Sequence, residues 1–219
     1  MQRWVIILSP ANFLHIKEKY TLWSAISQKT LWNNPLLTDR IPLGTFGELK
    51  NGYAFKSSTY IPNSKYRIIT IANVSGEREI DTGGCNTIPI LPKDLQPHQL
   101  LNINDILISL TGNVGRVSLC GSKDSCLNQR VGLFVLNNYS HHEYIFQVLS
   151  DRHFLHSMIE SGQGAAQMNI GKGDVESFLI PFADNPTLIN RISQLLLSLD
   201  SYIELEKKRY LLSFYMCVH

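Results

Sequence analysis

The sequence lacks any apolar run long enough to cross a membrane. No stretch approaches the roughly eighteen consecutive apolar residues of a membrane span. The opening run MQRWVIIL stops at Pro10 with no small-residue cleavage site, unlike a secretory signal peptide. At 219 residues and 44% apolar composition, the chain can bury a substantial core. We therefore expect a cytoplasmic globular protein that does not bind membranes.

Patterns for metal binding and disulfide formation are also missing. The four cysteines include no CxxC pair and no regular spacing, so we expect free thiols at Cys85, Cys120, Cys126 and Cys217. His153 and His156 lie three apart on an expected helix and can face one metal ion. Because no third ligand stands at a suitable spacing, we interpret them as exposed histidines.

Motifs for catalysis are equally scarce. There is no GxGxxG turn and no Asn/Asp-Pro-Pro-aromatic tetrapeptide of a methyltransferase, and GKGD at Gly171 lacks the rest of a phosphate-binding loop. A magnesium-dependent nuclease would cluster its carboxylates, whereas here they occur singly, at Asp81, Asp94, Asp105 and Asp124. We expect a chain that is not an enzyme and uses no cofactor.

Positive charge is low overall but unevenly distributed. The formal net charge is only +2. Residues 49–76 contain no acidic residue but carry Lys50, Lys56, Lys65 and Arg67. Such a local excess suits contact with phosphates. On charge alone, lysines that merely solvate a surface remain the simpler interpretation.

Residue patterns divide the chain into an N-terminal helical segment (1–40), a mixed domain (41–183) and a C-terminal helix (184–219). In the first segment, helical spacing is followed by Phe13, Ile16, Tyr20, Trp23 and Ile26. The second alternates short apolar runs with turn residues, which indicates strands in RIITIANV from Arg67, ILISL from Ile106, RVSLC from Arg116 and VGLFVL from Val131. One further stretch, 142–161, has helical periodicity. The fold class we predict is therefore α+β, with several short β-strands.

The third segment predicts a long coiled-coil-type helix. Asn185 is a suitable N-cap, and Pro186 is tolerated in the first turn. Steps of three and four then separate the apolar seam residues Ile189, Ile192, Leu196, Leu199 and Ile203. Such a seam needs a partner, because isolated helices gain little from propensity alone. That partner is the N-terminal helix, a second copy of the chain or another protein.

The most distinctive motif is the polar turn TGNVGR, residues 111–116. Its glycines suit a hairpin that needs positive φ angles, and this structural role explains them fully. It does not explain why Thr111, Asn113 and Arg116 gather there, since such side chains hydrogen-bond base edges and phosphates. A second amide-rich stretch, 163–170, is interpreted either as a flexible surface loop or as a further binding segment.

These motifs together resemble the specificity subunits of type I restriction-modification enzymes. The resemblance rests on LGTFGELKNGYAFKSSTY from Leu43, DILISLTGNVGRVSLC, CLNQRVG, GAAQMNIGKGDVESFLIP and LLLSLDSYIELEKK, in this order over about residues 41–209. It implies that residues 41–183 are a target recognition domain that reads one half of a split double-stranded DNA sequence. It also implies that the C-terminal helix is a spacer that docks methyltransferase subunits, and that catalysis belongs to those and to the restriction subunit.

Members of that family commonly have two recognition domains and two conserved helices, whereas this chain has one of each. It therefore resembles a half subunit, and residues 1–40 match nothing in the family. A half subunit can be completed by a homodimer, which would favour a palindromic site with an unspecified gap. The alternative is an interaction-only module or truncated remnant that docks a methyltransferase without reading DNA.

The residues that we predict to contact DNA come from three stretches. Tyr53 and Lys56 belong to the NGYAFKS loop and Lys50 directly precedes it; the others are Thr111, Asn113, Arg116, Gln167 and Asn169. Arg116 and the amides are suited to base edges, and the lysines to phosphates. Tyr53 is expected to pack rather than to stack on a base.

Overall fold

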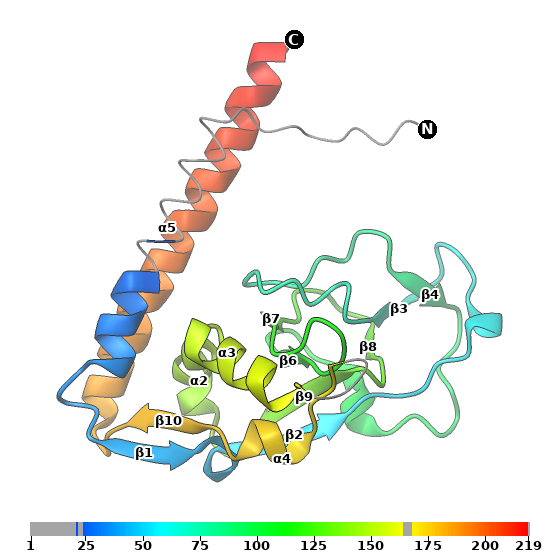
Figure 1. Cartoon of the computed structure of the whole chain (residues 1–219). Helices are drawn as coiled ribbons and strands as arrows, with labels where there is room; N and C mark the ends of the chain where they lie inside the picture. The colour runs from blue at the N-terminus through cyan, green and yellow to red at the C-terminus, as the bar shows by residue number, and fades with distance from the viewer. Residues whose placement is uncertain (1–20, 22–23, 164–167, 219) are drawn as a thin grey trace.

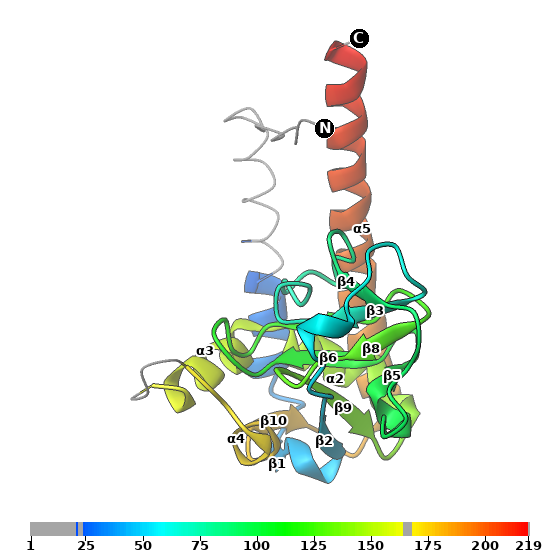
Figure 2. The same ribbon diagram turned by 90° about the vertical axis from the view of Figure 1, so that its right-hand side faces the viewer.

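The computed structural model describes Thr21, residues 24–163 and residues 168–218, with side chains up to Arg209. A globular body of short strands and helices carries one long helix, α5 (Pro186–Val218), whose C-terminal part extends well beyond that body (Figure 1; Figure 2). This confirms the predicted α+β fold with a long C-terminal helix. None of the helices among the described residues has the length and apolar character needed to cross a membrane.

The described strands form three small sheets. In the first, β1 (Asp39–Pro42) pairs antiparallel with β10 (Leu179–Phe182). The second is antiparallel, in the order β2 (Gly47–Asn51), β9 (Val131–Leu136), β6 (Ile106–Ser109), β7 (Val117–Leu119). The third runs β4 (Asn86–Ile88), β3 (Tyr66–Ile69), β8 (Ser125–Leu127), β5 (Leu100–Leu101), with β3 and β8 parallel.

The four apolar runs expected as strands coincide with β3, β6, β7 and β9, with β3 beginning one residue earlier, which confirms those predictions. Strand β6 shows why its sequence is continuously apolar. Ile106 and Ile108 face the main core, while Leu107 faces a second core shared with the third sheet. Because successive side chains of a strand point to opposite faces, a strand buried on both faces has no polar alternation.

The helix expected over 142–161 is in fact two helices. These are α2 (His142–Leu149) and α3 (Arg152–Ser161). The buried carboxylate of Asp151 accepts a hydrogen bond from the His153 N–H (3.0 Å) and so begins a new helix as its N-cap. The same carboxylate accepts a second bond from the Ser27 hydroxyl at 2.7 Å, which ties the N-terminal segment to this junction.

The remaining helical elements are short. Helix α4 spans Lys172–Glu176, and η1, a π-helix, spans Gln28–Trp32. Single 3-10 turns are η2 (Leu43–Thr45), η3 (Ser57–Thr59), η4 (Pro97–Gln99) and η5 (Tyr139–His141).

The N-terminal segment joins the body where it is described. Leu31 and Leu37 lie in the main core, and Ile26 packs against it. The boundary expected between residues 40 and 41 falls inside β1. The other residues of the predicted N-terminal stripe, Phe13, Ile16, Tyr20 and Trp23, lie outside the described residues. The three-part domain division stays a prediction.

The seam of α5 is largely buried by the chain itself. Its N-cap forms as expected, since Asn185 Oδ1 accepts from the Leu188 N–H at 3.1 Å. Ile189, Ile192 and Leu196 belong to the main core and Leu199 packs against it, while Ile203 is also buried. The seam therefore meets the body and is no free dimer face. Outside the seam, an exposed apolar stripe contains Leu195, Tyr202 and Leu205.

Candidate nucleic-acid interface

The turn between β6 and β7, residues 110–116, is fixed by hydrogen bonds to a buried serine. The buried Ser109 hydroxyl donates to the Asn113 carbonyl (2.5 Å) and accepts from the Arg116 N–H (3.0 Å). Gly112 and Gly115 have φ angles of +74° and +75°, which side chains rarely tolerate. The turn is thus pre-shaped, and Ser109 is a shaping residue that the sequence analysis did not select.

Two side chains of this turn point into solvent. Asn113 and Arg116 are exposed, and neither side chain makes a hydrogen bond or ion pair within the described part of the chain. A fixed backbone that presents an amide and a guanidinium suits hydrogen bonding to a polar ligand. The loop loses little conformational entropy on binding, because its backbone is already ordered.

The second amide-rich stretch lies directly beside the first. Thr111 and Asn169 form an isolated antiparallel bridge, and the Thr111 hydroxyl donates to Asn169 Oδ1 at 2.9 Å. On either side, the Gly112 N–H donates to the Met168 carbonyl and the Ile170 N–H to the Leu110 carbonyl, both at 2.9 Å. Two stretches more than fifty residues apart thus share one surface. The predicted Gln167 lies outside the described residues.

The NGYAFKS loop joins the same edge through the stretch after β8. The Tyr53 N–H donates to the Leu127 carbonyl (2.8 Å), and the Gln129 N–H donates to the Tyr53 carbonyl (3.0 Å). One residue further, the Arg130 carbonyl accepts from the Leu110 N–H at 3.0 Å. Backbone hydrogen bonds therefore connect the predicted stretches into one edge.

Gln129 and Arg130 are exposed at this edge and were not among the selected site residues. Their signal was present in the sequence as the polar run NQR between two apolar strands. Their position beside the β6–β7 turn is tertiary, because it depends on β6 pairing with β9. We add both residues to the candidate interface.

Two further predicted residues, Lys50 in β2 and Tyr53, have partners within the chain. Lys50 pairs with Glu48 at 2.5 Å, and that hydrogen bond, together with Lys172 nearby, lowers the pKa of Glu48. The Tyr53 hydroxyl donates to Asp94 Oδ1 at 2.8 Å, which raises the pKa of Tyr53. Lys56 is exposed on the same loop.

The histidine and the thiols considered as alternative sites are occupied in packing or hydrogen bonding within the fold. His153 Nδ1 lies 2.7 Å from Asp151 Oδ1, and its ring stacks on Trp32 with centroids 4.3 Å apart. Burial raises the pKa of the Cys126 thiol to about 12, so this thiol stays protonated at neutral pH. Within the described residues, no three His, Cys, Asp or Glu side chains are grouped so as to hold a metal ion.

The geometry defines a class of protein: an α+β globular body with a polar, pre-shaped edge and a projecting helix. The chain matches the family described as "Type I restriction modification DNA specificity domain" over residues 39–211. It belongs to that family, and the resemblance noted from its motifs is thereby confirmed.

Solved structures share the fold at low sequence identity. The S subunit of a type I restriction-modification system from M. genitalium has a TM-score of 0.64 and 13% identity, with 89% of this chain covering 50% of that one. The HsdS subunit from Thermoanaerobacter tengcongensis has a TM-score of 0.62 and 17% identity, with 90% of this chain covering 47% of that one. The chain thus spans about half the length of these structures. A search of curated proteins found no match.

Proposed function

We propose that this chain reads one half of a bipartite double-stranded DNA sequence as the specificity component of a type I restriction-modification system. The observation that carries the proposal is the convergence of Asn113, Arg116, Gln129 and Arg130 on one backbone-braced edge. Amides and guanidinium groups are the donors that pair with base edges in the major groove.

The predicted site residues take different roles in this proposal. Arg116 and Asn113 read base edges, and Lys56 contacts phosphates. Thr111 and Asn169 bond to each other and so brace the edge. Lys50 pairs with Glu48 within β2, and Tyr53 bonds to Asp94 from the loop that follows, so both support the edge rather than contact DNA.

Selection of bound fragments from a random duplex library tests this proposal. We expect enrichment of a half-site with a defined base sequence. Binding should weaken steeply as the salt concentration rises, because phosphate contacts release counterions. If no sequence is enriched, the proposal is wrong. Absence of any salt-dependent DNA binding would favour the alternative, an interaction-only module that docks a methyltransferase.

We further propose that α5 carries the contacts with methyltransferase subunits and with a second copy of the chain, and that methyl transfer and cleavage belong to partner subunits. Two facts support the second copy. The chain spans about half of the S subunit structures, and α5 exposes Leu195 and Leu205 outside its buried seam. A two-fold dimer would present two recognition bodies and favour a gapped palindrome.

A further inference from the structure

One segment touches both the β6–β7 turn and the long helix. Residues 76–80 run along the outer edge of β7, where the Leu119 N–H donates to the Arg78 carbonyl (2.7 Å) and the Ile80 N–H to the Leu119 carbonyl (3.0 Å). A Cβ built on the Gly76 backbone would lie 4.0 Å from Arg116 Cγ, so the Gly76 backbone runs near the Arg116 side chain. The segment is therefore fixed to the recognition body next to a residue proposed to read DNA.

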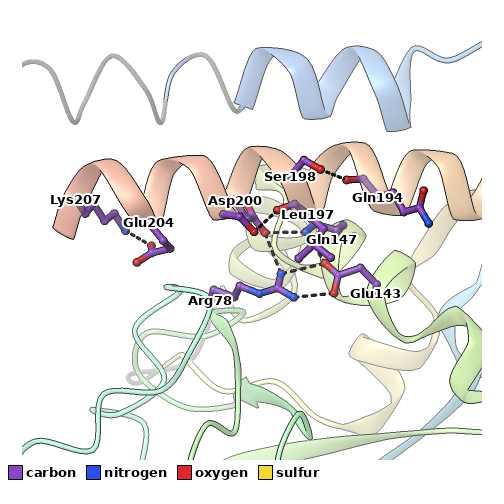
Figure 3. Close-up of polar contacts among 10 residues, drawn as sticks. Arg78, Glu143, Gln147, Gln194, Leu197, Ser198, Asp200, Glu204 and Lys207 are labelled. Atoms are coloured by element: carbon purple, nitrogen blue, oxygen red, sulfur yellow. Dashed lines mark hydrogen bonds and ion pairs between the residues drawn. The ribbon is translucent and has the colours of Figure 1, made fainter. Parts of the chain in front are cut away.

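From the same segment, the Arg78 side chain reaches two helices (Figure 3). Its guanidinium makes a two-pronged pair with Glu143 of α2, at 2.7 and 3.0 Å, and a third bond to Asp200 of α5 at 3.1 Å. Gln147 of α2 completes the group, since its amide donates to Asp200 Oδ2 (2.7 Å) and Glu143 Oε1 (2.8 Å). We call Arg78, Glu143 and Asp200 the clasp.

The clasp is shielded and directional. Its side chains are only 23%, 22% and 16% exposed, and the Arg78 guanidinium lies over the Phe146 ring, 4.9 Å from its centroid. Salt screens such partly buried pairs less than surface pairs. A planar guanidinium that bonds carboxylates at set angles also fixes orientation, which apolar packing does less strictly.

A second contact lies further along α5. Lys207 pairs with Glu77, the neighbour of Arg78, and with Glu204 at 2.6 Å. Asp200 and Lys207 are two turns apart, about 10 Å along the helix axis. Two anchors on one rod define its direction as well as its position.

The polar anchors lie towards the end of the apolar contacts between α5 and the body, beside Leu199 and Ile203. Ile189, Ile192 and Leu196 bury the beginning of α5 in the main core. The clasp and Lys207 hold α5 further along, where it leaves that core (Figure 1; Figure 3). Since a half-buried ion pair adds little net stability, control of the angle is the better account of its position.

We propose that Arg78 is a positioning residue that sets the angle between α5 and the β6–β7 turn, and thereby the number of unread base pairs between two half-sites. This inference rests on the proposed function and its two-copy assembly. One base pair more or less in the gap rotates the second half-site by about 34° around the DNA axis. A recognition body must hold its angle to well within that rotation to prefer one gap length.

The first experiment needs no DNA. Spin labels at Lys123→Cys in the body and Ser201→Cys on α5, in a Cys85→Ser, Cys217→Ser background and diluted with an excess of unlabelled chains, report one narrow distance distribution within a chain if the angle is fixed. Arg78→Met is expected to broaden it, because methionine keeps the contact with Phe146 but donates no hydrogen bond. The matched control is Arg209→Met, which removes an ion pair confined to α5. An unchanged width in Arg78→Met overturns the inference.

The second experiment is selection from duplex libraries in which the gap between half-sites varies in length. The intact chain is expected to enrich one gap length, and Arg78→Met to bind two or more adjacent lengths comparably with the same letters. The inference is contradicted if Arg78→Met still selects a single gap length, or if it no longer selects the same half-site bases. Failure of the intact chain to select any half-site contradicts the proposed function instead. If Arg78→Met does not fold, Asp200→Asn provides the same comparison while leaving a side chain that Gln147 can bond.

Discussion

Side chains that face solvent at the β6–β7 turn alternate with groups that hold its shape. Asn113 and Arg116 are exposed, whereas Ser109 and Val114 are buried beneath them. Substitutions in the two groups should therefore have different consequences. Loss of an exposed donor should change what is bound, and loss of a shaping group should change how well the body folds.

Arg116→Ala should relax preference at a single base position. A good two-pronged contact to a base contributes roughly 1–3 kcal/mol of discrimination, and alanine offers no donor. Lys56→Ala is the comparison: it should weaken binding to all sequences alike and reduce the salt slope by about 1. Library selection and salt titration measure the two effects. An unchanged selection profile for Arg116→Ala would show that this turn does not read DNA.

Gly115→Ala should destabilise the fold more than Gly112→Ala. Both glycines have left-handed φ angles, so each substitution costs about 1 kcal/mol of backbone strain. At Gly115 the new Cβ would also lie 2.7 Å from Met158 Cβ, which adds about 1–3 kcal/mol of overpacking. At Gly112 the nearest atom is Ile71 Cδ1, at 3.6 Å. Urea unfolding compares the two, and equal losses would argue against the close packing of α3 on the turn.

Among the elements, α5 has three sides with different surroundings. Its seam joins the core, its polar side joins the clasp, and its outer stripe is exposed. The clasp adds a titratable connection between elements. Burial raises the pKa of Asp200, with Glu143 acting in the same direction, while Gln147 and Arg78 oppose the increase.

Arg78→Met should therefore destabilise the fold more at pH 7.5 than at pH 5. Without Arg78, the pKa of Asp200 rises further above its unfolded value, because burial and Glu143 remain. Between those two pKa values the native state binds more protons than the unfolded state, so the free energy of unfolding falls as pH rises. We expect a loss of about 1–3 kcal/mol near neutral pH and a smaller one at pH 5. Urea unfolding at both pH values measures the loss of stability. Equal losses at the two pH values would contradict the role given to Asp200. The control Arg209→Met should show little change at either pH.

At the scale of the whole molecule, two copies are expected to associate through the outer stripe of α5. Replacing Leu195 and Leu205 together by aspartate should convert a dimer to a monomer, because each charge would be buried without a partner. Asn190→Asp is the control, since it adds a charge at an exposed position on another side of the same helix. Sedimentation or light scattering gives the mass. A monomeric intact chain at micromolar concentration would refute the dimer. Leu196 is unsuitable for this test because it is fully buried in the core of its own chain.

The sequence by itself determined the elements whose cause is local. Asn185 and Pro186 specify where α5 begins, and the apolar runs around Ile106 and Val131 specify β6 and β9. The glycine spacing in residues 111–116 determines the turn. These features follow from capping, periodicity and backbone freedom, which act within a few residues.

Only the tertiary structure decided which distant residues meet. Pairing of β6 with β9 places Arg130 beside the β6–β7 turn, and the Thr111–Asn169 bridge joins the second amide-rich stretch to it. Folding of α5 onto the core buried a seam whose spacing alone suited an external partner equally well. Arg78, Glu143 and Asp200 form a clasp although no spacing links them. Contacts between residues far apart in the chain depend on how packed elements share surface and charge, and no local pattern encodes that.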